Sequence, residues 1–145
     1  MVESGEETDR VLAGSTIGLC LDTGHLLIGG GDPVAVARRH PDRVAHVHLK
    51  DVAADVAGRV RHAGLSYTDG VRAGMYRPLG QGDVDVAAIV TSLEGAGYTG
   101  WYVLEQDTIL DAEPTADGST RAPVEDVRTS LEHLREVAAT LGAPA

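Results

Sequence analysis

The chain alternates short apolar runs with segments of helical periodicity, and this alternation constrains its fold more than any other feature. Three almost continuously apolar runs predict buried strands at residues 16–21, 44–49 and 101–104. Such runs are typical of parallel strands that are covered on both faces. Helices are predicted at residues 6–13, 33–39 and 123–141, and from residue 85 to residue 95 or 97. Alternating strands and helices predict right-handed βαβ units around one parallel sheet.

Two segments fall outside this alternation. Residues 51–82 carry a weak helical signal at 53–61 and otherwise resemble a loop. A loop of this length in a compact domain is usually functional or disordered. Residues 111–122 are polar and rich in turn formers, and they are predicted to form a loop before the last helix. Three parallel strands cannot close a barrel, which takes eight strands and usually about 250 residues. An open three-stranded sheet would leave its edges exposed.

The composition excludes several function classes. The 145 residues carry a formal net charge of −10, which argues against binding to nucleic acid or to anionic membrane surfaces. No apolar stretch is long enough to span a bilayer, and the acidic N-terminus does not resemble a secretory signal. The single cysteine, Cys20, cannot form an internal disulfide and is expected to be a small buried hydrophobe in a reducing compartment. We therefore expect a cytoplasmic protein without nucleic-acid or membrane partners.

A potential metal ligand stands at or beside the end of each predicted strand. These ligands are Asp22, His48 and Glu105. The C-terminal ends of parallel strands converge at one rim of a barrel, where active sites form. Two carboxylates and one imidazole at such a rim would suit a divalent cation such as Mn²⁺, Mg²⁺, Co²⁺ or Zn²⁺. For Asp22 taken alone, capping of the following loop is an equally good interpretation.

Three further polar residues lie near these ligands in the sequence. His46 and His48 share one face of their strand, because side chains alternate with period two. His46 lies one layer deeper and is expected to be an interior histidine, although the two rings could also chelate one metal ion. Lys50 could exchange a proton with a substrate if neighbouring cations lower its pKa, or it could be a surface lysine. His25, in the turn after Asp22, could reach a substrate hydroxyl or be solvated.

Several motifs along the chain resemble one enzyme family. They are Leu-Cys-Leu-Asp-Thr-Gly-His at 19–25, Val-Ala-His-Val-His-Leu-Lys-Asp-Val at 44–52 and Gly-Tyr-Thr-Gly-Trp-Tyr-Val-Leu-Glu-Gln-Asp at 97–107. Together they resemble the sugar isomerase/epimerase superfamily of xylose isomerase-like TIM barrels. Residues 71–76 and 78–83 resemble the long loop of its inosose dehydratase subgroup. The resemblance covers residues 2–110, whereas the final helix at 123–141 is generic.

The resemblance implies a fold and a ligand set. The three predicted strands resemble strands six to eight of a (β/α)8 TIM barrel, so residues 1–145 are expected to form a single C-terminal fragment of that domain. Asp22, His48 and Glu105 match three metal ligands of the superfamily, and the fourth ligand, on the fifth strand, has no counterpart here. The implied metal is Mn²⁺ or Co²⁺, with Mg²⁺ or Zn²⁺ as alternatives. His25 matches a substrate-contacting histidine, and Glu105 also matches an acid/base group.

The activity implied by the resemblance is metal-dependent dehydration of a small polyhydroxylated cyclic ketone, an inosose, in inositol catabolism. Glu105 would take the proton next to the ketone, and Lys50 or His25 would help the neighbouring hydroxyl to leave and would contact the substrate. A ketose epimerase or sugar isomerase using the same site is the alternative. A third hypothesis is a remnant or half-barrel that is inactive alone and needs an N-terminal half-barrel chain or a homo-oligomeric partner.

Overall fold

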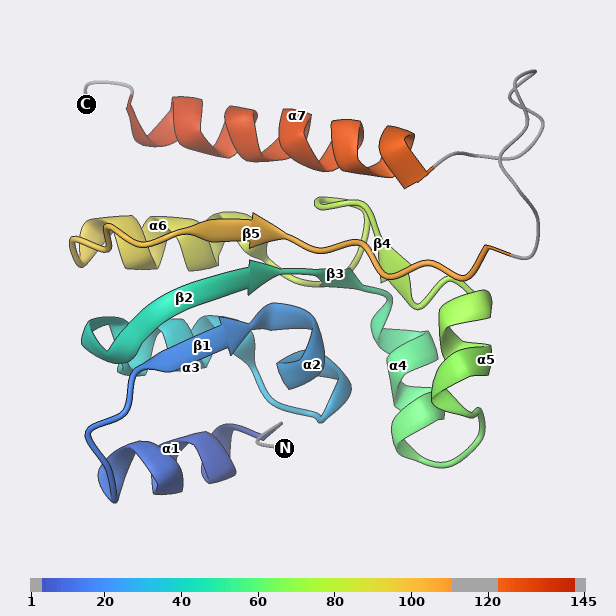
Figure 1. Ribbon diagram of the computed structural model, residues 1–145, viewed down its shortest axis with the longest axis horizontal. Helices are drawn as coiled ribbons and strands as arrows, with labels where there is room; N and C mark the ends of the chain where they lie inside the picture. The colour runs from blue at the N-terminus through green and yellow to red at the C-terminus, as the bar shows by residue number, and fades with distance from the viewer. Residues whose placement is uncertain (1–3, 111–122, 143–145) are drawn as a thin grey trace.

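Three parallel strands form the central sheet of the protein (Figure 1). The computed structural model describes residues 4–110 and 123–142. The strands are β1 (Leu19–Asp22), β2 (Val44–Leu49) and β5 (Tyr102–Leu104), in the spatial order β1-β2-β5. The register places Asp22 opposite His48, and His48 opposite Val103. The three predicted strands and their parallel pairing are therefore confirmed.

The first strand begins later than the apolar run predicts. β1 starts at Leu19 rather than at residue 16, and the side chain of Ile17 is 55% exposed. The Arg43 guanidinium donates hydrogen bonds to the backbone carbonyls of Ser15 and Ile17, at 2.9 and 2.7 Å. A side chain, rather than a neighbouring strand, satisfies these two carbonyls. Residues 16–18 of the apolar run therefore belong to the connection before β1.

Helices cover one face of the sheet. Figure 1 shows α3 (Pro33–Arg39) and α6 (Val86–Gly95) behind the strands, with α1 (Gly5–Ala13) and α7 (Pro123–Leu141) flanking them. The four predicted helices are thus confirmed, and the third ends at residue 95, the earlier of its two predicted ends. The core between sheet and helices contains side chains with no measurable exposure, among them Val36, Val47, Leu49, Ile89 and Leu93.

The opposite face of the sheet is uncovered in the part of the chain that the structure describes (Figure 1). Trp101, just before β5, is 77% exposed, and Cys20 on β1 is exposed. The prediction of strands covered on both faces is therefore wrong, and so is the prediction that Cys20 is buried. The physical reason is that Cys20 shares a face with Asp22, away from the helices, because strand side chains alternate.

Residues 51–82 contain more regular structure than their sequence indicates. The weak helical signal is confirmed as α4 (Ala54–Arg61), but the rest is not a loop: α5 (Tyr67–Arg72) follows, and β3 (Asp51–Val52) pairs antiparallel with β4 (Tyr76–Arg77). A Cβ atom on Gly70 would lie 2.5 Å from Cγ2 of Val60, so α5 approaches α4 more closely than a larger residue would allow.

Asp51 organises the chain that follows β4. Its side chain is buried, and one carboxylate oxygen accepts backbone N–H bonds from Gly80 and Gly82 at 2.8 and 2.9 Å. The other oxygen accepts from Val52 and Val84 at 2.9 and 3.0 Å. Backbone donors thus satisfy the buried charge, which would otherwise be costly in a dry interior.

The last helix has the predicted bounds, but its apolar stripe is only partly covered. Val137 is buried and Leu134 packs against the core, whereas Val124, Leu131 and Leu141 are 48%, 37% and 38% exposed. The predicted loop at 111–122 lies outside the described residues. Over the described residues, no helix is both long and apolar enough to cross a membrane.

We expect Gly58→Ala to raise the free energy of unfolding by roughly 0.5–1 kcal/mol. Gly58 lies inside α4, and no atom lies within 4 Å of the position that its Cβ would take, so alanine adds helix propensity without strain. Urea unfolding of both chains measures the difference. Gly70→Ala is the control in α5, where the crowded Cβ position should make the same change destabilising. Destabilisation by Gly58→Ala would contradict this prediction.

Candidate metal centre

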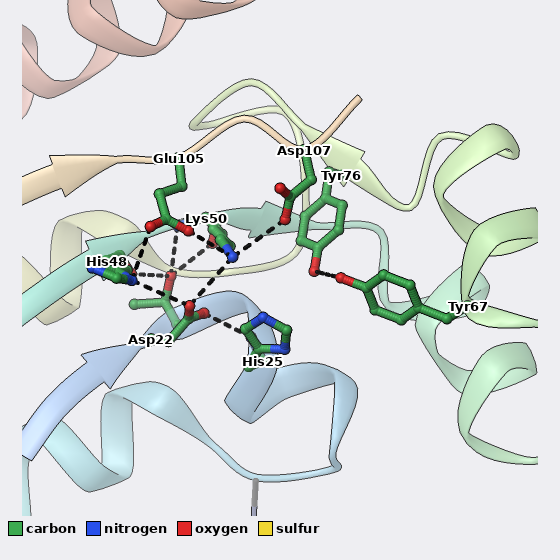
Figure 2. Close-up of polar contacts among 9 residues, drawn as sticks. Asp22, His25, His48, Lys50, Tyr67, Tyr76, Glu105 and Asp107 are labelled. Atoms are coloured by element: carbon green, nitrogen blue, oxygen red, sulfur yellow. Dashed lines mark hydrogen bonds and ion pairs between the residues drawn. The ribbon is translucent and has the colours of Figure 1, made fainter. Parts of the chain in front are cut away.

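The three predicted ligands converge at the C-terminal end of the sheet (Figure 2). Asp22 ends β1, His48 lies near the end of β2, and Glu105 directly follows β5. His48 Nδ1 lies 3.6 Å from Asp22 Oδ2 and 3.0 Å from Glu105 Oε1. One ligand atom from each residue lies within 4.8 Å of the other two. The structure therefore brings the three side chains together, as the pattern of strand ends predicts.

Asp22 also fulfils the capping role considered for it. It is the N-cap of α2 (Thr23–Ile28), and its Oδ1 accepts the backbone N–H of His25 at 2.9 Å. The segment predicted as a turn is thus a short helix. Because Oδ1 is used by the cap, Oδ2 is the oxygen that faces His48. The His25 ring lies beside the Asp22 carboxylate in Figure 2.

Lys50 is the buried centre of the cluster. Its side chain is only 5% exposed, and Nζ lies 2.7 Å from Glu105 Oε2, 3.3 Å from Asp22 Oδ2 and 3.2 Å from Asp107 Oδ2. Asp107, the last residue of the motif at 97–107, thus belongs to the same group. The alternative interpretation of Lys50 as a surface lysine is wrong, because the surrounding carboxylates compensate for the burial of its charge.

The neighbours of Lys50 also decide the direction in which its pKa moves. Burial alone lowers the pKa of Lys50, but the hydrogen bond to Glu105 and the charges of Asp22 and Asp107 outweigh it, so the pKa is raised above its usual range. The condition for proton exchange considered from the sequence, a pKa lowered by neighbouring cations, is not met, because carboxylates surround Nζ instead. In this arrangement Lys50 is therefore a firmly charged hydrogen-bond donor.

Thr23 and Gly24 fix the position of Lys50, a role that their place in the motif at 19–25 does not reveal. The Thr23 hydroxyl donates to the backbone carbonyl of Lys50 at 2.7 Å and accepts its backbone N–H at 2.9 Å. A Cβ atom on Gly24 would lie 2.7 Å from the Cβ of Lys50, so only glycine fits at this contact. The first turn of α2 therefore holds β1 and β2 together directly below the cluster.

Tyr76 closes the side of the cluster nearest α5. Its ring centroid lies 5.7 Å from Lys50 Nζ, within the range of a cation–π interaction. The hydroxyl groups of Tyr76 and Tyr67 lie 2.7 Å apart. Burial, together with the hydrogen bond to Tyr67, raises the pKa of Tyr76 well above its usual range, so the phenol stays neutral. Sequence reasoning missed Tyr76 because it lies in the segment predicted as a loop.

His46 lies beneath the cluster rather than in it. Its ring makes an edge-to-face contact with that of His48, at a centroid distance of 5.1 Å. Over the described residues, the group of potential ligands that lie close together contains His48 but not His46. The arrangement supports the interpretation of His46 as an interior histidine over chelation of one ion by both rings.

The donor set fits a divalent cation. Metal–ligand bonds of about 2.0–2.2 Å place neighbouring donors on one ion roughly 3 Å apart, and opposite donors roughly 4 Å apart. The separations of 3.0 and 3.6 Å around His48 Nδ1 fall in this range. Three protein ligands also leave coordination positions open, as catalytic metal sites require. Residues Asp22, His48 and Glu105 can therefore hold such an ion without rearrangement of the backbone.

A parallel sheet with metal-type ligands at its C-terminal rim defines a class of barrel enzymes, and comparison with known families agrees. Residues 2–137 match the family described as "Xylose isomerase-like TIM barrel". The chain belongs to this family. The predicted partial (β/α)8 barrel is confirmed, because its described residues form three parallel strands with flanking helices.

Curated relatives are similar along nearly the whole chain. The chain is 38% identical over 144 residues to the rhizopine catabolism protein MocC of Rhizobium meliloti, covering 98% of this chain and 42% of the relative. It is 37% identical over 138 residues to inosose dehydratase of Lactiplantibacillus plantarum, covering 93% of this chain and 43% of the relative. It therefore spans less than half the length of these relatives.

Solved structures share the fold at lower identity. A xylose isomerase domain protein from Planctomyces limnophilus matches with a TM-score of 0.62 at 20% identity, covering 94% of this chain and 44% of the other. A D-tagatose 3-epimerase-like protein matches with a TM-score of 0.59 at 19% identity, covering 94% and 41%. At such identities the likeness establishes the fold alone.

Proposed function

We propose that this chain supplies the metal-binding rim of a lyase that removes water from a polyhydroxylated cyclic ketone of the inosose type. The observation that carries the proposal is the convergence of Asp22, His48 and Glu105 around a space suited to one divalent cation. Relatives named inosose dehydratase support the choice of substrate. Mn²⁺ or Co²⁺ is the proposed ion, with Mg²⁺ and Zn²⁺ as alternatives that the donor set also accepts.

The side chains around the rim divide the chemistry among them. The bound cation supplies Lewis-acid polarisation of the substrate ketone. A carboxylate oxygen of Glu105 takes the proton from the carbon beside that ketone, and the electron pair of the broken C–H bond forms the new double bond. The hydroxyl on the next carbon leaves with a proton from His25, so one water molecule is released. The Lys50 ammonium stabilises the negative charge that develops on the ketone oxygen.

Titration of Mn²⁺ into the 145-residue chain by calorimetry tests the metal site. We expect saturable micromolar binding that Asp22→Asn weakens at least about tenfold, or roughly 1.4 kcal/mol. Asparagine removes the ligand charge but keeps an oxygen that can accept the His25 N–H, so α2 retains its cap. Asp42→Asn, an exposed acid in the 3-10 turn before β2, is the matched control and should bind as the parent does.

Circular dichroism accompanies each titration, so that a loss of binding is not confused with a loss of fold. Equal affinity in the parent and Asp22→Asn chains would reject Asp22 as a ligand. The absence of any saturable binding by a folded chain would reject the three-residue site in this form.

A ketose epimerase or sugar isomerase is the second candidate, because the same cluster suits it. Epimerisation and dehydration both begin with removal of a proton beside a ketone, and Glu105 is the proposed base for either reaction. Resemblance of residues 71–76 and 78–83 to the dehydratase subgroup supports the lyase. Mass spectrometry of the product separates the two reactions, since a lyase product is lighter than its substrate by one water and an epimer has the same mass.

We further propose that turnover requires strands outside this sequence. The uncovered face of the sheet and the relatives of more than twice its length support an N-terminal half-barrel partner. A homo-oligomer is the alternative, and sedimentation of the purified chain distinguishes a monomer from it. Without a partner, the rim stays open to water and the substrate is held from one side only, so the isolated chain should be inactive.

A further inference from the structure

A polar cavity adjoins the candidate metal centre. It has a volume of about 300 Å³ and lies where β4 and the end of α5 meet the chain that follows β5. Asp107 and Tyr76 belong both to its wall and to the surroundings of Lys50. Figure 2 shows these two side chains on the side of Lys50 away from His48. The volume is at the lower end of that of small-molecule sites.

The wall of this cavity is rich in groups that can pair with hydroxyls. Arg77, Gln81, Gln106 and Thr108 contribute a guanidinium, two amides and a hydroxyl. Each amide both donates and accepts hydrogen bonds, as the hydroxyls of a polyol do. Among the residues that the structure describes, none forms a hydrogen bond with the side chains of Arg77, Gln81 or Gln106.

The charges around the cavity balance. Two arginines, Arg72 and Arg77, and two carboxylates, Asp107 and Asp126, line it. Asp107 also pairs with Lys50 and Arg72 with Asp69, and these two further charges cancel as well. A site for a phosphate group would present an excess of positive charge. A balanced set of donors and acceptors instead favours a neutral ligand with many hydroxyl groups.

The cavity is also built on a rigid base. Arg77 lies on β4, where it is the register partner of Asp51. Gln81 ends a turn in which its backbone N–H donates to the carbonyl of Pro78 at 3.0 Å. On either side of it, the backbone N–H groups of Gly80 and Gly82 donate to the Asp51 carboxylate. Side chains supported in this way can bind a ligand with little cost in backbone ordering.

We propose that this cavity binds the hydroxyl groups of a neutral cyclic polyol, those remote from the reacting carbons, and that Arg77 and Gln81 are its main contacts. The choice of a cyclitol rests on the proposed function. A ring in this cavity would have Asp107 in its wall, on the side that leads to Lys50. Selection of an unphosphorylated substrate follows from the balanced charge.

Binding of myo-inositol to the 145-residue chain, followed by ligand-observed NMR in the presence of a metal chelator, tests the proposal. We expect saturable binding that Arg77→Met and Gln81→Ala each weaken fivefold or more. Arg59→Met is the matched control, because Arg59 is an exposed arginine on α4 outside the cavity wall. An inositol monophosphate should bind no more tightly than inositol.

Three outcomes would overturn the proposal: no saturable binding of inositol, equal binding by the Arg77→Met and Arg59→Met chains, or tighter binding of the phosphate. Mn²⁺ titration of the Arg77→Met chain separates this proposal from the metal site, since its Mn²⁺ affinity should equal that of the parent. Inositol binding without Mn²⁺ binding would support the polyol cavity and reject the metal centre. Mn²⁺ binding without inositol binding would support the metal centre and reject the polyol cavity.

Discussion

Asp51→Asn is expected to lower the free energy of unfolding by roughly 2–6 kcal/mol. The buried Asp51 carboxylate accepts four backbone N–H groups, two on each oxygen. Asparagine keeps one oxygen and turns an NH₂ group toward the other two N–H donors, which are then left without an acceptor. Each unsatisfied buried donor costs about 1–3 kcal/mol. Urea unfolding monitored by circular dichroism measures the change.

Asp55→Asn is the matched control for this experiment. Asp55 is exposed in the first turn of α4, so the same change of charge to amide should alter the stability by less than about 0.5 kcal/mol. If Asp51→Asn were as mild as its control, residues 80–84 would not depend on the buried carboxylate. The cavity proposed as a polyol site would then lack its rigid base.

Leu93→Ala is expected to destabilise the chain by roughly 2–5 kcal/mol. Leu93 has no measurable exposure in α6, and its side chain packs in the core between that helix and the sheet. Truncation removes buried methyl groups and leaves a cavity that surrounding strands and helices cannot fill completely. The same unfolding titration gives the difference in stability.

Leu131→Ala on α7 is the counterpart with the same chemistry at a partly exposed position. Its side chain is 37% exposed, so the loss should stay below about 1 kcal/mol. A loss from Leu131→Ala as large as that from Leu93→Ala would show that the outer face of α7 is covered in solution, either by another copy or by a partner chain.

The convergence of the three potential ligands could be predicted because it depends on the strand pattern. Buried strands are recognisable from their apolar runs, and parallel strands end at the same rim, so Asp22, His48 and Glu105 had to be neighbours once the strands were placed. The α6 core face was predictable for the same reason: Val86 and Leu93 recur with helical spacing and are buried.

What could not be predicted depends on contacts between distant segments. The burial of Lys50 needs carboxylates from β1 and from the chain after β5, and the role of Thr23 needs the strand beside it. The helix α5 begins at a cap by Ser66, a residue that in sequence reads equally well as part of a loop. Cys20 lies on a sheet face that no described helix covers, which a short apolar run does not reveal.

The placement of Lys50 among three carboxylates sets the electrostatic balance of the rim. Three negative charges from Asp22, Glu105 and Asp107 and one positive charge from Lys50 sum to −2 when His48 is a neutral ligand. One divalent ion makes the group electroneutral, whereas Na⁺ or K⁺ would leave a residual charge that is costly to hold partly out of water. At the proposed site, this charge would favour a divalent over a monovalent ion, and it would not discriminate among Mn²⁺, Co²⁺, Mg²⁺ and Zn²⁺.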